Sequence, residues 1–392
     1  MIYLFVLFLL LFLSFRYDIC GKIKYRNQWY LVILIIFILI AGLRYRIGID
    51  TPRYMFAFYH DYPTIDKFSF NHYYIGKDPF YVLINSVVRS LKGRFYIVQI
   101  INAIFVNFLI LNYIKKHSKY LFTCAFFYFL LLYTGLLMEA MPASFSVAIC
   151  LYANDYFQEK KWVKGYLLLL IATLFHAQTL ALFVLPLFFS LRFNKCGILM
   201  LFIAYIGGIF LQQILGDYAF LLEGNAQLEH KVSSYAESDK YGENDRSLFY
   251  SIFKIILPVV YCIFSLWYCK RYSRNKNLML MEPFIMLGLM FVMVQASFVI
   301  AYRYVHYYVI YFIFFYAETF ICMIKRSEHL NIGLAYIKCV ILFLPLMINS
   351  LHFFNDCRYY PYSSVITKSV NKERENRFKK ADNYFYPKSN EY

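Results

Sequence analysis

The sequence predicts an all-α polytopic integral membrane protein with about 10–13 transmembrane or re-entrant helices. Of its 392 residues, 61% are hydrophobic and only 16% are charged, whereas soluble domains average about 45–50% apolar and about 25% charged residues. The apolar residues form long runs that are separated by short loops rich in Lys and Arg. Both observations indicate membrane helices flanked by topology signals.

The apolar runs give the expected spans directly, since a membrane helix needs about 20 mainly apolar residues. Two further stretches are ambiguous. Pro79–Leu91 is short and interrupted by Asn85 and Arg89, and Val163–Leu191 is long for one span and holds His176 near its middle. The candidate spans are Ile2–Phe15, Trp29–Leu43, Phe95–Ile114, Tyr120–Leu137, Pro142–Phe157, Gly197–Leu215, Leu248–Cys269, Leu278–Ala301, Tyr304–Ile324 and Ile332–Leu351.

The charges of the loops decide how Val163–Leu191 is arranged, because basic loops favour the cytoplasmic side. With Arg16–Gln28 inside, a single crossing would put the basic loops Arg192–Lys195 and Lys270–Lys276 outside and the acidic loop Gly216–Arg246 inside. A hairpin satisfies all three loops. Each arm would have about 14 residues, or ~21 Å, which suits a re-entrant pair buried in protein. The sequence therefore predicts a hairpin with His176 near the outer face.

Two regions follow from this topology. Residues 1–351 are expected to form a single transmembrane helical domain, with extracytoplasmic segments 44–78 and 216–246, and residues 352–392 form a polar, basic tail. The tail begins outside, although its basic residues favour the opposite side. The net charge of +17 lies mainly in loops. It is therefore interpreted as topology signals and contacts with anionic membrane lipids, with no nucleic acid as a partner.

The segment Gly42–Tyr54, GLRYRIGIDTPRY, carries the densest group of candidate site residues. Arg44 and Arg46 are bidentate donors suited to phosphate. Gly48 permits a tight bend or a close backbone approach, and Asp50 could orient an arginine or take a proton. The alternative is that both arginines are interfacial anchors whose side chains reach toward the membrane surface.

Two more ionisable residues lie within or beside apolar runs. His176 stands in LFHAQ and Arg303 in AYRYVHYY. Ionisable groups inside a membrane are costly and mark functional candidates, but His176 could instead join two helices by a hydrogen bond, and Arg303 could be an interfacial anchor. The many tyrosines form interface belts or line a path for sugar rings. The nine cysteines contain no CxxC pair and read as small buried hydrophobic residues.

Five segments with a distinctive order and residue pattern follow one another along the chain. They are GLRYRIGIDTPRY at Gly42–Tyr54, DPFYVLIN at Asp78–Asn85, LFHAQTLALFVLP at Leu174–Pro186, AYRYVHYY at Ala301–Tyr308 and YYPYSSV at Tyr359–Val365. Together they resemble the EpsG family, a branch of the Wzy-like polysaccharide polymerases. One departure is that Met138–Ile149, MEAMPASFSVAI, lacks the Arg-Gln pair usual in the family, so a positive contact is missing or supplied elsewhere.

The resemblance implies a GT-C-like or Wzy-like helical bundle in the bacterial cytoplasmic (inner) membrane. It implies a metal-independent glycosyltransferase without cofactors, which polymerises undecaprenyl-pyrophosphate-linked repeat units at the outer face. Arg44, Arg46 and Arg303 would neutralise the pyrophosphate, and Asp50 or His176 would deprotonate the acceptor hydroxyl. Tyr54, Tyr360 and Tyr362 would contact the substrate. A chain-length regulator and a flippase of the same pathway are the implied protein partners.

Two other functions stay open at this stage. A flippase or exporter of lipid-linked glycans would also need arginines, but such proteins usually show two related halves and charges along a central path. A membrane O-acyltransferase would need a partner for His176. The sequence shows no P-loop, HExxH or GxSxG motif and no metal-ligand spacing. The polymerase reading predicts that the cationic and titratable residues converge in one extracytoplasmic pocket.

Overall fold

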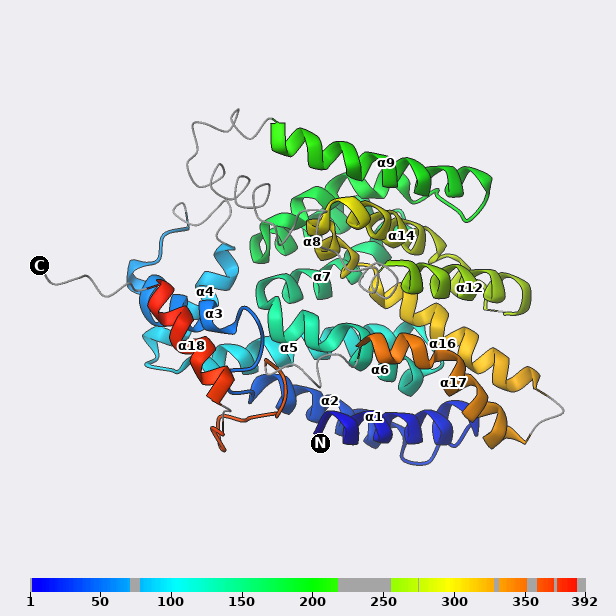
Figure 1. Cartoon of the computed structure of the whole chain (residues 1–392), viewed down its shortest axis with the longest axis horizontal. Coiled ribbons are helices and arrows are strands. Elements are labelled where there is room, and N and C mark those ends of the chain that lie inside the picture. Colours follow the sequence, from blue (N-terminus) through cyan, green and yellow to red (C-terminus); the bar gives the residue numbers. More distant parts are fainter. Residues whose placement is uncertain are drawn as a thin grey trace, which may run out of the picture. The chain divides into compact units, whose positions relative to one another are not determined.

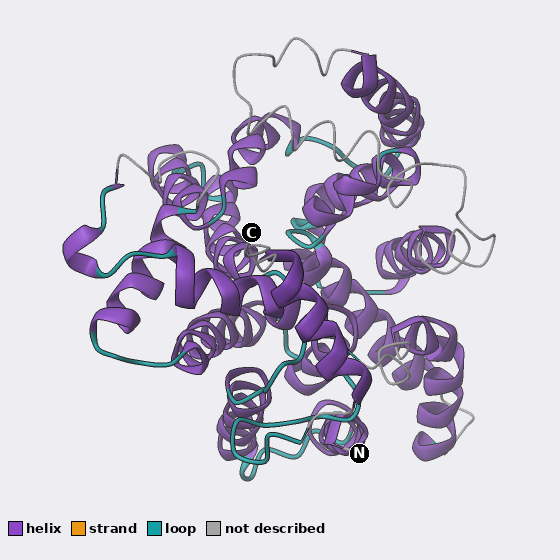
Figure 2. Cartoon of the chain, turned by 60° about the vertical axis from the view of Figure 1, so that its left-hand side comes forward, coloured by secondary structure: helices purple, strands orange, loops and turns teal. Residues whose placement is uncertain are grey.

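A computed structural model describes residues 2–70, 78–217, 255–273, 275–327, 331–350, 358–369 and 372–385. Within these ranges the regular elements are helices and there is no sheet, as Figure 2 shows. The predicted all-α fold class is confirmed. From residue 218 onward, the predicted acidic loop Gly216–Arg246 lies outside the described residues.

Several helices have the length and apolarity of membrane spans. Ile2–Ile19, Phe95–His117 and Leu121–Glu139 are long and apolar enough to cross a bilayer. Shorter apolar helices cover Arg26–Gly42, Trp162–Phe175, Ala177–Phe188, Lys195–Leu211, Glu282–Ser297 and Ile332–Met347. The chain is a multi-pass membrane protein.

The chain divides into two compact units, Met1–Val184 with Ser350–Tyr392, and Leu185–Asn349. In the first unit α2 packs on α5, α5 on α7, and α7 on α8. Its elements are α1 (Ile2–Leu13), η1 (Ser14–Ile19), α2 (Arg26–Gly42), α3 (Thr51–Phe56), η2 (Ala57–Asp61), η3 (Ile65–Lys67), α4 (Pro79–Ser90), α5 (Phe95–His117), α6 (Leu121–Tyr128), η5 (Phe129–Glu139), α7 (Met141–Gln158), α8 (Trp162–Phe175) and α18 (Lys372–Phe385). The helix η6 (Ala177–Phe188) runs across the boundary between the units.

In the second unit α9 packs on α14, and α12 on α16. Its elements are α9 (Lys195–Asp217), α12 (Leu257–Tyr272), α13 (Lys276–Met279), α14 (Glu282–Ser297), η10 (Val299–Ala301), α15 (Tyr302–Val305), α16 (Val309–Arg326) and α17 (Ile332–Ser350). The Lys270 ammonium lies 2.5 Å from Glu282 and donates to the Phe193 carbonyl at 3.0 Å. Arg326 lies over the Tyr272 ring. The basic loops of this unit thus meet at one end, as the predicted topology requires.

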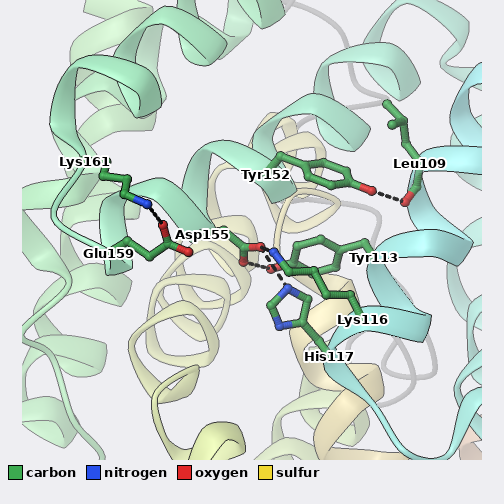
Figure 3. A network of polar contacts seen from close by, with 8 residues as sticks. All are labelled: Leu109, Tyr113, Lys116, His117, Tyr152, Asp155, Glu159 and Lys161. Atoms are coloured by element: carbon green, nitrogen blue, oxygen red, sulfur yellow. Dashed lines mark hydrogen bonds and ion pairs between the residues drawn. The ribbon is translucent and has the colours of Figure 1, made fainter.

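One end of the first unit is tied together by a carboxylate between α5 and α7 (Figure 3). Asp155 accepts hydrogen bonds from Tyr113 Oη at 2.9 Å and Lys116 Nζ at 2.7 Å, and its Oδ2 lies 2.9 Å from His117 Nε2. At the same end Arg26 donates to the Lys119 carbonyl at 2.7 Å. The basic loops of this unit therefore gather at one end, which the positive-inside rule assigns to the cytoplasm.

Replacing Asp155 by Ala is expected to lower the free energy of unfolding by about 1.5–3 kcal/mol, because a nearly buried carboxylate leaves charged and hydroxyl donors without their acceptor. Thermal unfolding of the purified protein in detergent measures this change. Glu159→Ala is the matched control, since the Glu159–Lys161 pair is exposed and such pairs contribute only about 0–1 kcal/mol. Equal melting temperatures for the two variants would contradict the structural role of Asp155.

The chain reverses direction at His176, as the loop charges predict. His176 has extended backbone angles between α8 and η6. The rings of Tyr166 and Phe183, on either side of it, stack with centroids 5.8 Å apart. In one straight helix these two residues would lie ~25 Å apart. The hairpin with His176 at its turn is therefore present.

The C-terminal segment returns to the opposite end of the first unit. The Tyr45 N–H donates to the Ser363 carbonyl at 2.9 Å, and the Val365 N–H donates to the Leu43 carbonyl at 2.8 Å. Next in the chain, α18 packs on α3, and Figure 1 shows α18, α3 and α4 grouped together. Residues 358–369 and 372–385 of the tail therefore lie at the same end of the unit as the segment after α2. The positive charge of the tail alone favours the opposite side.

Candidate functional site

Arg44 follows the last turn of α2 and is completely buried, with 0% of its surface exposed. Its Nη1 donates to the Ala41 carbonyl, whereas Nε and Nη2 have no hydrogen-bond partner. It forms no ion pair with a carboxylate in the described parts of the chain. Burial lowers the pKa of the Arg44 guanidinium to about 10, so the group stays positively charged at neutral pH.

Four tyrosine hydroxyls surround this guanidinium within electrostatic range: Tyr133, Tyr81, Tyr362 and Tyr3. Tyr133 donates to the Phe37 carbonyl, and Tyr362 donates to the Ile40 carbonyl at 3.1 Å. The Tyr81 hydroxyl is buried beside the Asn85 side chain. The rings of Tyr3 and Tyr362 meet edge to face with centroids 5.9 Å apart.

We call the cluster of Arg44 with Tyr3, Tyr81, Tyr133 and Tyr362 the anion cage. Its hydrogen-bond donors without an acceptor determine which ligands it can bind. A buried charge costs several kcal/mol unless an opposite charge and hydrogen bonds compensate. Here the buried Arg44 guanidinium presents N–H groups without acceptors. Planar guanidinium groups match the oxygens of phosphate and carboxylate. The arrangement therefore has the charge and the hydrogen-bond donors that an anion-binding site needs.

Gly48 allows the segment after Arg44 to close on the end of η5. Its φ is +111°, and a Cβ at this position would lie 2.2 Å from the Met138 carbonyl oxygen and 2.8 Å from Thr51 Oγ1. The hydroxyl of Thr51 in turn donates to the Ile47 carbonyl at 2.5 Å. The close backbone approach predicted for Gly48 is confirmed.

Gly48→Ala is expected to destabilise the protein strongly, because the backbone conformation alone costs about 1–3 kcal/mol for a residue with a side chain and the methyl group also collides with a carbonyl. The melting temperature of the purified variant tests this. Gly135→Ala is the control, since a Cβ there meets nothing within 4 Å. A Gly48→Ala protein as stable as Gly135→Ala would contradict the packing described here.

A carboxylate and an imidazole meet where α4 begins and the hairpin turns. His176 Nδ1 lies 3.4 Å from Asp78 Oδ2, and Asp78 Oδ1 accepts the Ala177 N–H at 3.0 Å. The other ring nitrogen, Nε2, lies 3.2 Å from the side-chain amide oxygen of Gln178. The side chains of His176 and Asp78 are each about 20% exposed. The pair is thus held in place by the backbone yet reachable, as an acid–base group must be.

The first turn of α4 links the Asp78–His176 pair to the anion cage. Asp78 precedes the helix, and Tyr81 lies one turn further along, beside Arg44. The Tyr54 ring packs against Tyr81 with centroids 5.8 Å apart. Burial and the carboxylates of Asp50 and Asp78 raise the pKa of the Tyr54 hydroxyl well above its ordinary value. Anion cage and acid–base pair therefore form one continuous cluster in the first unit.

The other expected residues are placed differently. Arg46 stacks its guanidinium on the Phe378 ring, 5.1 Å from the centroid. Asp50 is exposed just before α3, and Tyr360 is 39% exposed. Arg303 belongs to the second unit, where it lies in α15 beside the Tyr302 ring. Convergence of Arg303 with Arg44 stays a prediction.

Sequence reasoning missed the partner of His176. Asp78 is not among the residues predicted for the site, although a carboxylate before a proline that begins a helix, in an external segment, is a candidate acid–base residue. Tyr3 and Tyr133 were counted among apolar spans. Nothing in their own segments marks them as neighbours of Arg44, since the contacts come from packing of separate helices.

Comparison with known proteins gives one result on the whole chain. A model described as EpsG family matches residues 27–364. No curated protein matches the chain. No solved structure matches it either.

Proposed function

Because the chain belongs to the EpsG family, which is associated with exopolysaccharide biosynthesis, we propose that it polymerises lipid-linked oligosaccharide repeat units by glycosyl transfer. The donor is a growing glycan on undecaprenyl pyrophosphate, and the acceptor is a hydroxyl of the next lipid-linked unit. The reaction takes place at the outer face of the bacterial cytoplasmic membrane. The observation that carries the proposal is the buried Arg44 with donors that lack an acceptor.

The anion cage suits the leaving group of this reaction. When the bond between the anomeric carbon and the pyrophosphate oxygen breaks, negative charge grows on the lipid pyrophosphate. A pre-arranged guanidinium that is buried in the protein stabilises that charge. The apolar helices that surround the cage suit the polyprenyl tail.

His176 and Asp78 suit the acceptor side. The acceptor hydroxyl attacks the anomeric carbon and loses its proton to the imidazole, while Asp78 holds the ring and stabilises the imidazolium that forms. The new glycosidic bond replaces the bond to pyrophosphate, so one bond forms and one breaks. We assign the base to His176, because its ring lies 3.4 Å from the Asp78 carboxylate, whereas Asp50, the other candidate, is exposed.

Deletion of the protein in the bacterium that carries it tests the reaction. Loss of a polymerase leaves single repeat units on the cell surface, whereas loss of a flippase leaves no unit outside. The proposal is supported if the deletion strain displays single repeat units and if restoring the parent protein replaces them with long chains. Absence of any surface unit would favour an exporter instead.

Site-specific labelling tests the side of the membrane. In a protein with all nine cysteines replaced by Ser, Ile366→Cys is expected to react with an impermeant maleimide from outside the cell, and Lys119→Cys only after permeabilisation. Both positions are exposed and lie at opposite ends of the first unit. The reverse labelling pattern would place the candidate site in the cytoplasm and exclude the proposed reaction.

A further inference from the structure

The helix α18 presents an unusual inner face. Positions 374, 377 and 378, spaced for one face of a helix, are Arg374, Arg377 and Phe378. The remaining residues between 372 and 380 are exposed, apart from the half-buried Glu375. An amphipathic helix ordinarily places apolar residues on its inner face, but two of these three residues are arginines. The helix lies beyond residue 364, where the family match ends.

Two contacts of this face dock the helix. Arg377 Nη2 donates to the Ile49 carbonyl at 2.9 Å. The Phe378 ring supports the guanidinium of Arg46. These contacts hold α18 on the segment that follows Arg44, next to α3 (Figure 1).

Arg374 is the most deeply buried arginine of α18. Its exposed fraction is 0%, and its Nη2 donates to the Pro361 carbonyl at 2.8 Å. Tyr362, which follows Pro361, is one of the tyrosines of the anion cage. The Tyr3 hydroxyl lies within electrostatic range of both Arg374 and Arg44. Two completely buried arginines, from opposite ends of the chain, therefore border the same tyrosine.

We propose that Arg374 is a second substrate-binding arginine, which together with Arg44 forms a two-cation site for a lipid-linked diphosphate. The proposal rests on the proposed function for the nature of the ligand. A diphosphate between a sugar and a lipid carries one negative charge on each phosphorus atom, so one guanidinium balances only half of it. The second guanidinium matches the oxygens of the second phosphate, which a monophosphate does not have.

Binding of farnesyl diphosphate and farnesyl monophosphate to the full-length protein in nanodiscs tests the proposal. The parent protein is expected to bind the diphosphate at least 10-fold more tightly than the monophosphate. Arg374→Gln is expected to weaken diphosphate binding about 10-fold or more and monophosphate binding much less. Arg374→Lys, which keeps the charge without the bidentate geometry, is expected to lie between.

Arg377→Gln is the matched control, because it removes an arginine from the same face that only docks the helix. Melting temperatures without ligand identify any variant that fails to fold. If Arg377→Gln weakens diphosphate binding as much as Arg374→Gln, Arg374 acts through helix docking and the proposal is wrong. It is also wrong if folded Arg374→Gln binds the diphosphate like the parent protein.

The outcomes separate this proposal from the function on which it rests. Loss of diphosphate binding in Arg44→Met but not in Arg374→Gln overturns the second arginine and leaves the polymerase intact. Loss in both variants, with no repeat units outside the cell after deletion of the protein, supports the two-arginine site and overturns polymerisation.

Discussion

Arg44→Met is expected to abolish chain elongation while leaving the protein as stable as the parent or more stable. Arg44 is completely buried, and two of its nitrogen atoms have no hydrogen-bond partner. Without a ligand such a cation costs several kcal/mol, and methionine fills a similar volume without charge. Removal of one group that stabilises charge in a transition state typically slows a reaction about 10²–10³-fold. Function and stability should therefore move in opposite directions.

Two measurements check this prediction: the length distribution of the surface glycan in a complemented deletion strain, and the melting temperature of the purified protein. Arg16→Met is the control, since Arg16 is exposed at the basic end of the same unit. Long glycan chains from the Arg44→Met strain would exclude a role in binding the leaving group. A markedly lower melting temperature would show that Arg44 is a structural residue.

Asp78→Asn and His176→Gln are each expected to slow polymerisation about 10²–10⁴-fold, the range for loss of an acid–base group. The Asp78→Asn, His176→Gln double variant is expected to be no slower than the slower single variant. This follows because Asp78 acts through His176, to which it lies 3.4 Å away, and residues that act as a unit are not additive. Rates of glycan elongation in membrane vesicles measure the effect.

Asp66→Asn provides the control for the loss of a carboxylate, because Asp66 is exposed in the same segment between α2 and α4. A double variant slowed by the product of the two single effects would mean that the residues act independently. If instead both single variants lose thermal stability and elongate glycans normally, the pair serves only to hold the hairpin turn.

The amino-acid sequence by itself determined the helices and the reversal of the chain at His176. Long apolar runs can satisfy their backbone groups in a membrane only as helices, so spans such as Phe95–Ile114 and Ile332–Leu351 were predictable. The charges of distant loops also required Val163–Leu191 to reverse near His176, and the stacking of Tyr166 on Phe183 shows that reversal. Gly48 could be expected at a close approach because glycine has no side chain.

Tertiary structure decided which of these residues meet. Arg44 and Arg46 are two positions apart and look equivalent in the sequence, yet one is buried among tyrosines and the other stacks on Phe378. Asp78 and His176 are separated by 98 positions, and Arg374, near the other end of the sequence, donates to the Pro361 carbonyl beside Tyr362. Local periodicity describes which face of a helix is buried, but not which helix lies opposite. Only the packing of separate helices could bring such distant residues together.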